Sequence, residues 1–162
     1  MPGEPIVVRA LLEALAICIA SAACEGLAAG SGVRQRFAEL RMPPYSPPLG
    51  LWVVIGVLYY GVCFFVSYRL LSAGVGWSAR GLALALLIVL MTLNVLWNIV
   101  FFRRKDLHAS YMGFWPYLSV AAALLGVLSS LDSHAALVFL PYVIYLGYAL
   151  WWSYRLWRLN GA

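Results

Sequence analysis

The stretch GLALALLIVLMTLNVLWNIVFF, from Gly81 to Phe102, contains no charged residue. About 20 predominantly apolar residues in an α-helix cross the roughly 30 Å of hydrocarbon in a bilayer. Apolar and polar residues do not alternate along this stretch, so it lacks the pattern of a strand in a membrane barrel. We therefore predict a transmembrane helix, because a helix satisfies its own backbone hydrogen bonds in lipid.

Four other stretches have the same character: residues 6–29, 49–68, 111–131 and 135–154. Of the 162 residues, 64% are hydrophobic and 10% are charged, whereas a soluble domain has about 45–50% apolar and about 25% charged residues. A soluble fold of this length could not bury so much apolar surface, and disordered chains are poor in aromatic residues, which make up 15% here. The sequence predicts an all-α integral membrane protein in a lipid bilayer, a five-transmembrane-helix bundle forming one domain over residues 1–162.

The connections between the predicted helices set their orientation. Residues 30–48 form the longest connection, which four prolines near its end stiffen, and only residues 132–134 separate the last two helices, which must form an antiparallel hairpin. Eight Lys and Arg residues fall on the side of the long loop and the C-terminus, and three fall on the other side, namely Arg9, Arg69 and Arg80. Because the side richer in Lys and Arg stays in the cytoplasm, we expect a cytoplasmic C-terminus and an N-terminus outside.

The net charge of +5 does not indicate a nucleic-acid partner, because the basic residues lie between apolar stretches, where they contact lipid headgroups. Cys18, Cys24 and Cys63 lie in apolar stretches and are expected to serve packing. The sequence has no metal-ligand spacing, phosphate-binding loop or Ser/His/Asp arrangement with supporting context, so we predict no catalytic residue, metal site or cofactor, and favour a binding protein over an enzyme. The first stretch has no clear cleavage site of a signal peptide, so we expect it to be retained.

Two carboxylates lie in the first predicted helix. Glu13 follows Arg9 by four residues, so it is either half of an ion pair at the membrane interface or a functional carboxylate inside the membrane. Glu25 lies near the other end of the helix and is expected at the interface. Small side chains recur every four residues from Ala14 to Gly30, which would let another helix approach closely.

One face of the charge-free helix carries Asn94, Trp97 and Phe101. Amide side chains this deep in hydrocarbon need partners. Asn94 and Asn98 of this helix therefore either hydrogen-bond to other helices or anchor a ligand in a cavity. In the last helix, Tyr142 and Tyr145 are too deep for an interfacial aromatic belt. They either bond to neighbouring helices or line a pocket, and the sequence leaves both alternatives open.

Three segments resemble the TspO family, also called translocator protein, peripheral benzodiazepine receptor or tryptophan-rich sensory protein. FAELRMPPYSPP, residues 37–48, resembles the first loop of the family, and NVLWNIVFF, residues 94–102, resembles its third-helix motif Asn-x-x-Trp-x-x-x-Phe-Phe. LPYVIYLGYALWWSYRLWRLN, residues 140–160, resembles the fifth helix, with its Pro-Tyr start and its Tyr, Arg and Asn at the end. The resemblance covers roughly residues 36–160 and rests on the order and spacing of the segments.

The resemblance implies a ligand cavity beneath the long first loop, which acts as a lid. Family members bind porphyrins and other tetrapyrroles, sterols such as cholesterol, and benzodiazepine-type compounds, and their proposed roles are transport, sensing and regulation. By matching position, the expected ligand-binding residues are Asn94, Trp97, Phe101, Tyr142, Tyr145, Pro47, Trp52, Tyr59 and Tyr60. The expected rim is Arg36, Arg41 and Tyr45, where the two arginines would meet the carboxylates of a tetrapyrrole.

The first function hypothesis is a sensor, carrier or regulator that binds a porphyrin, a haem-type tetrapyrrole or a similar hydrophobic molecule such as a sterol or isoprenoid. The alternatives are an enzyme that degrades porphyrin in light, and a structural subunit or chaperone of a membrane complex. Pro44, Tyr45 and Tyr145 stand where the family commonly has tryptophans, and such photochemistry uses tryptophans, so the enzyme is less favoured. A homodimer is a further expectation.

Overall fold

The computed structural model describes residues 4–73 and 77–161, which are almost entirely helical. In chain order its elements are α1 (Glu4–Ala29), α2 (Val33–Glu39), α3 (Leu49–Ser72), α4 (Trp77–Asn98), the π-helix η1 (Ile99–Arg104), α5 (Leu107–Met112), α6 (Phe114–Leu131) and α7 (Ser133–Asn160). Five segments are long and apolar enough to cross a membrane: Ile6–Ala29, Leu49–Ser72, Ser78–Arg104, Leu107–Leu131 and Ser133–Asn160. The predicted fold class, an all-α membrane protein with five spans, is confirmed.

The helices continue beyond the apolar stretches at their charged ends. α3 runs past Arg69 to Ser72, and α7 runs past Arg155 to Asn160. A long arginine side chain near the end of a membrane helix can extend its guanidinium group to the lipid headgroups. A charged residue therefore marks the membrane surface, and the helix can continue past it. The fourth span is interrupted at Gly113, which separates the short α5 from α6.

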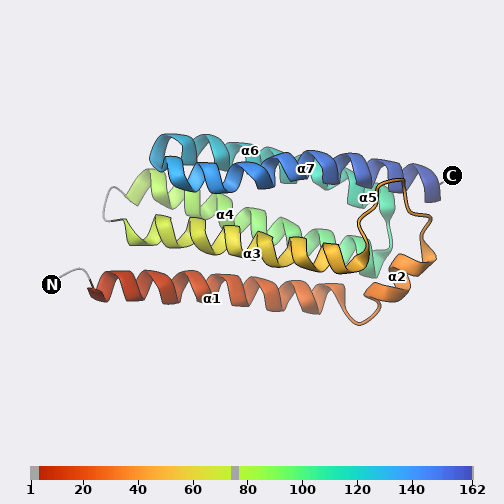
Figure 1. Ribbon diagram of the computed structural model, residues 1–162, viewed down its shortest axis with the longest axis horizontal. Helices are drawn as coiled ribbons and strands as arrows, with labels where there is room; N and C mark the ends of the chain where they lie inside the picture. Colours follow the sequence, from red (N-terminus) through yellow and green to blue (C-terminus); the bar gives the residue numbers. More distant parts are fainter. Residues whose placement is uncertain (1–3, 74–76, 162) are drawn as a thin grey trace.

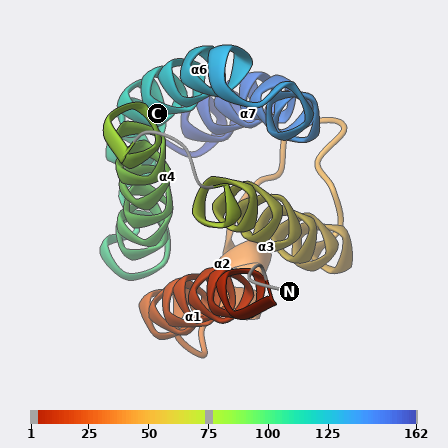
Figure 2. The same ribbon diagram turned by 90° about the vertical axis from the view of Figure 1, so that its left-hand side faces the viewer.

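The spanning helices form a ring in the order α1, α3, α7, α6, α4 (Figure 2). α1 packs against α3 and α4, while α6 packs against α4 and α7, and α7 closes the ring against α3. Figure 1 shows α2 and the C-terminal end of α7 at one end of the bundle, and the N-terminal end of α1 at the other. The long first connection therefore covers a single end of the ring.

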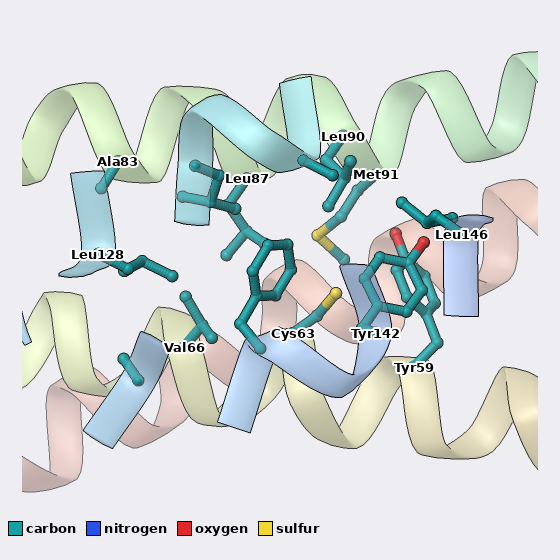
Figure 3. Packing of buried hydrophobic residues seen from close by; sticks show 14 of the residues in the cluster. Tyr59, Cys63, Val66, Ala83, Leu87, Leu90, Met91, Leu128, Tyr142 and Leu146 are labelled. Carbon is teal, nitrogen blue, oxygen red and sulfur yellow. The ribbon is translucent and has the colours of Figure 1, made fainter. Parts of the chain in front are cut away.

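The packed core lies where α3, α4, α6 and α7 meet (Figure 3). Val66, Leu87 and Leu128 are fully buried there. By contrast, Val57 and Ile144 on the outer faces are both 68% exposed. Lipid tails cover such outward apolar side chains, so the helices are held together by close packing and interhelical hydrogen bonds.

α1 approaches α3 closely through small side chains. Ala14 and Cys18 are buried there, and the Cys18 Sγ lies 3.8 Å from the carbonyl oxygen of Tyr60. On the exposed side of α1, Arg9 Nε donates to Glu13 Oε1 at 2.7 Å. Of the two alternatives for Glu13, an ion pair with Arg9 or a functional carboxylate inside the membrane, this geometry is that of the ion pair.

Asp132 fastens the tight turn between α6 and α7. One carboxylate oxygen accepts from the backbone N–H groups of His134 and Ala135, at 3.1 and 3.2 Å, and so caps α7. The other accepts from Arg69 Nε of α3 at 2.7 Å. The hydrogen bond from Arg69 is the main cause that lowers the pKa of Asp132, and the two backbone N–H groups lower it further.

Replacing Asp132 with alanine is expected to lower the free energy of unfolding at neutral pH by about 1 kcal/mol, as for other lost helix caps. Because the folded-state pKa lies below the unfolded value of about 3.9, the stabilisation is complete above that value and is lost as pH falls through the folded-state pKa. Thermal unfolding in detergent between neutral pH and about pH 3 measures this.

The matched control is Asp132→Asn, which keeps an oxygen for the helix cap and cannot ionise. Its deficit relative to the native chain should be smaller than that of Asp132→Ala and should shrink as pH falls toward the folded-state pKa of Asp132. A deficit of Asp132→Ala that is as large at about pH 3 as at neutral pH would contradict the role of the carboxylate charge.

Candidate ligand cavity

A cavity of about 290 Å³ lies inside the ring of helices, beneath α2 and the connection 40–48, which together we call the lid. The lid reaches the cavity through Val33 and Phe37. The other lining residues are Glu25 and Ala29 of α1, Leu49, Trp52, Val53, Ile55, Gly56 and Tyr59 of α3, Asn94, Trp97 and Asn98 of α4, Phe102 of η1, Phe114 and Tyr117 of α6, and Tyr142, Tyr145, Leu146, Ala149 and Trp152 of α7. Such a lining, mostly apolar with a few polar groups, is typical of small-molecule sites.

Two aromatic groups build the walls. On one side the Trp52 ring lies 4.9 Å from Trp152 and 6.5 Å from Tyr145, measured between ring centroids. On the other, Trp97 stacks on Phe101 with centroids 4.8 Å apart and planes 12° apart. Trp97 Nε1 also donates to the carbonyl oxygen of Ser110 at 3.2 Å. These contacts fix the ring planes that the cavity presents.

Tyrosine side chains form the deep end of the cavity. The rings of Tyr59 and Tyr142 lie 5.1 Å apart, and both hydroxyl groups point to the same side in Figure 3. The Tyr142 hydroxyl forms a hydrogen bond with the hydroxyl of Tyr117. The Tyr59 hydroxyl is buried and has no hydrogen-bond partner among the residues that the structure describes.

Glu25 forms the polar part of the cavity wall. Its carboxylate accepts hydrogen bonds from the Tyr60 hydroxyl, from Asn94 Nδ2 at 2.9 Å and from Asn98 Nδ2 at 3.2 Å. Glu25 lies four residues before the end of α1, and its interfacial depth stays a prediction. The sequence did not reveal that its carboxylate faces inward, because the three donors come from α3 and α4, whose register against α1 is not a local property. Asn94 combines the two alternatives left open for it, since it bonds to another helix and also lines the cavity.

The π-helix η1 sets the aromatic residues at the end of α4. Its widened turns end at Lys105, which has a positive φ of 54°. Phe101 is buried behind Trp97, while the next residue, Phe102, lines the cavity. A π-helical turn therefore lets two consecutive phenylalanines pack at this end of the bundle, where Phe37 of the lid lies 6.2 and 6.3 Å from their rings.

Side chains of α7 hold the lid in place. Asn160 brackets the backbone of Arg41, accepting from its N–H at 2.8 Å and donating to its carbonyl oxygen at 3.0 Å. The Tyr148 hydroxyl donates to the Tyr45 carbonyl oxygen at 2.9 Å, and Trp152 Nε1 donates to Ser46 Oγ at 2.8 Å. The lid is thus fastened along the last turns of the fifth span.

Six of the nine expected ligand-binding residues line the cavity: Asn94, Trp97, Tyr142, Tyr145, Trp52 and Tyr59. The other three are not among its lining residues. Phe101 supports Trp97 from behind, and Tyr60 reaches the site through its hydrogen bond to Glu25. Pro47 lines a separate shallow pocket between the lid and the start of α3. Their roles in ligand binding stay predictions.

None of the expected rim residues, Arg36, Arg41 and Tyr45, is among the lining residues of the cavity. Arg36 is 8% exposed, donates to the Lys105 carbonyl oxygen at 3.1 Å, and lies over the Phe101 ring at 5.6 Å. Lys105 Nζ in turn donates to Glu39 at 3.0 Å, which is the main cause that lowers the pKa of this carboxylate. Arg36 is therefore engaged in fixing α2 to η1. The side chain of Tyr45 is 89% exposed and points away from the site.

The described residues contain no group of three or more His, Cys, Asp and Glu side chains placed to hold a metal ion. Five membrane helices surround an aromatic cavity beneath a proline-rich lid. This is a polytopic membrane bundle with an internal, lid-covered cavity. The sequence model of the TspO/MBR family matches residues 14–158, nearly the whole chain, and the chain belongs to this family. A search of the curated proteins found no match.

Proposed function

We propose that the protein binds a flat hydrophobic ligand in the cavity beneath the lid and acts as its sensor, carrier or regulator. The observation that carries this proposal is the lining, in which indole and phenol rings surround a single carboxylate. Aromatic faces attract flat rings, and a few convergent polar groups orient a bound molecule. Tetrapyrroles, haem-type ones included, are the first ligands to test, and sterols and isoprenoids are the next.

The charge count orients the lid toward the cytoplasm, so a ligand would enter from the cytoplasm or from the cytoplasmic leaflet of the bilayer. Self-association as a homodimer is part of the same proposal. Ala22 and Gly26 of α1 are exposed on the outer surface of the bundle, where small side chains would let a helix of a second copy approach.

Titration with protoporphyrin in detergent is expected to quench tryptophan fluorescence saturably. Asn94→Leu should weaken binding by between a few-fold and about a hundredfold, because it removes a donor that orients Glu25 and leaves polar groups unpaired. Trp97→Ala should also weaken binding, since it removes a stacking surface, after allowance for the lost fluorophore.

The matched controls are outward-facing residues: Thr92→Leu on the same helix as Asn94, and Trp115→Ala, whose indole is 49% exposed and does not line the cavity. Both should bind as the native chain does. Quenching that rises linearly, as for partition into the micelle, would contradict a tetrapyrrole site and favour the role of a structural subunit or chaperone. Unchanged affinity in both Asn94→Leu and Trp97→Ala would contradict the placement of the ligand against α4.

A further inference from the structure

Glu25 is the only charged side chain among the described residues that line the cavity. The other carboxylates in ion pairs have cationic partners: Glu13 pairs with Arg9, Glu39 with Lys105, and Asp132 with Arg69. Within residues 4–73 and 77–161, Glu25 forms no salt bridge. A charge in the wall of a mostly apolar cavity without an opposite charge is costly, so its presence calls for an explanation.

The groups around Glu25 suit an ionised carboxylate. The Tyr60 hydroxyl and Asn94 Nδ2 both donate to Oε2, while Oε1 accepts only from Asn98 Nδ2, at 3.2 Å. An ionised carboxylate accepts and never donates, and its two oxygens offer about four acceptor positions. All three neighbours act as donors and all are neutral, so they orient the carboxylate without cancelling its charge. Oε1 retains capacity for one further donor.

The same cavity contains two other polar groups without partners. Trp52 Nε1 and the Tyr59 hydroxyl are buried, line the cavity, and form no hydrogen bond with any described residue. Tyr59 is only 6% exposed. Buried polar groups are nearly always satisfied in native proteins, so unpartnered ones in a cavity wall point to a ligand. The faces of the same two rings would also attract a cation.

From these observations we infer that the cavity is built for a compact hydrophobic molecule with a cationic nitrogen, a protonated amine or its equivalent, which pairs with Glu25. This inference rests on the proposed function, that the cavity binds a hydrophobic ligand. A cation supplies the opposite charge that the three neutral donors do not, and its N–H would use the free position on Oε1. Glu25 would repel an anionic molecule of the same shape, and no basic side chain among the described lining residues would offset that repulsion.

The size of the cavity agrees with a compact ligand. Its volume of about 290 Å³ lies just below the range for small-molecule sites, which is about 300–1,000 Å³. A bicyclic aromatic amine is a ligand of this compact size. The ring system would contact the indoles of Trp52 and Trp97, with the nitrogen directed toward α1.

The test compares three probes of one shape that differ in charge: naphthylmethylammonium, naphthylmethanol and naphthoate. Binding is measured by titration calorimetry with the full chain in nanodiscs of phosphatidylcholine, a lipid without net charge. The native protein should bind the ammonium probe at least about tenfold more tightly than the alcohol, and the carboxylate weakest, as expected for a hydrogen-bonded charge pair.

The diagnostic variant is Glu25→Gln, which keeps the shape and removes the charge. It should lose at least about tenfold in affinity for the ammonium probe and stay within about threefold of the native affinity for the alcohol. The matched control is Glu13→Gln on the same helix, whose carboxylate is exposed and already paired with Arg9, and which should bind all three probes as the native chain does.

The comparison of the three probes on the native chain tests the inference even if the Glu25→Gln protein does not fold. Equal affinity of the native chain for ammonium, alcohol and carboxylate would overturn the inference and leave the proposed function intact. Unchanged ammonium binding in a folded Glu25→Gln protein would overturn it as well. Absence of binding for all three probes would overturn the inference, while the protoporphyrin titration decides separately whether the proposed function stands.

Discussion

Replacing Gly56 with phenylalanine is expected to abolish ligand binding and to leave the bundle folded. Gly56 lines the cavity from α3, and a Cβ built on it meets no other atom within 4 Å. The phenyl ring can therefore occupy the chamber without displacing the helices, and the ligand would have to displace the ring. Affinity should fall by at least about a hundredfold, measured with the probe that binds the native chain.

Gly61→Phe is the matched control for this experiment. Gly61 lies on the same helix, its Cβ position is equally open, and it does not line the cavity. Both substitutions remove a helix-interior glycine, so their effects on helix stability should be alike. Native affinity in a folded Gly56→Phe protein would show that the ligand binds elsewhere on the molecule.

Replacing Trp152 with alanine is expected to give the largest loss of stability, about 3–5 kcal/mol of unfolding free energy, as for other large aromatic residues in packed cores. Trp152 is 2% exposed, and its ring lies 4.9 Å from Trp52 and 6.2 Å from Phe101. Its Nε1 also donates to Ser46 Oγ of the lid. The substitution removes core packing and a lid fastening together, which thermal unfolding in detergent measures.

Two controls separate these contributions. Trp152→Phe retains a ring and loses the hydrogen bond to Ser46, so its deficit should be about 0.5–1.5 kcal/mol plus a small packing loss. Trp151→Ala changes the adjacent indole, which is 40% exposed, and should lose less than about 1 kcal/mol. Equal deficits in Trp151→Ala and Trp152→Ala would mean that both indoles stabilise the protein through the membrane interface and not through the core.

The five spans could be predicted because length and lack of charge decide whether a helix crosses a bilayer, and both are local properties of the sequence. The cavity face of α4 was predictable for a similar reason. Asn94 and Trp97 are three residues apart, so they share a face, and an amide in hydrocarbon needs a partner. The matching residues of the family supplied the expectation for Tyr142 and Tyr145 of α7.

What the sequence did not predict depends on contacts between distant segments. Glu25 and Asn94 are separated by 69 residues, and only the packing of α1 on α4 brings them to hydrogen-bonding distance. Arg36 was expected at the rim, where it would meet the carboxylates of a tetrapyrrole. The lid instead turns it onto the Phe101 ring and the Lys105 carbonyl oxygen. One pattern could have indicated the role of Glu25. Its carboxylate and the amides of the third predicted span lie at a similar depth in the membrane, to within about one helical turn.

The contacts of Glu25 also bear on the order in which the helices are inserted into the membrane. Its hydrogen-bond donors follow it by 35, 69 and 73 residues along the chain. Two of these donors, Asn94 and Asn98, belong to α4, which is synthesised and inserted after α1. A lone carboxylate in hydrocarbon is unfavourable, and this end of α1 therefore stays hydrated at the membrane surface until α4 has been inserted. Arrival of the third span, and not of the first, then completes the assembly of the N-terminal half.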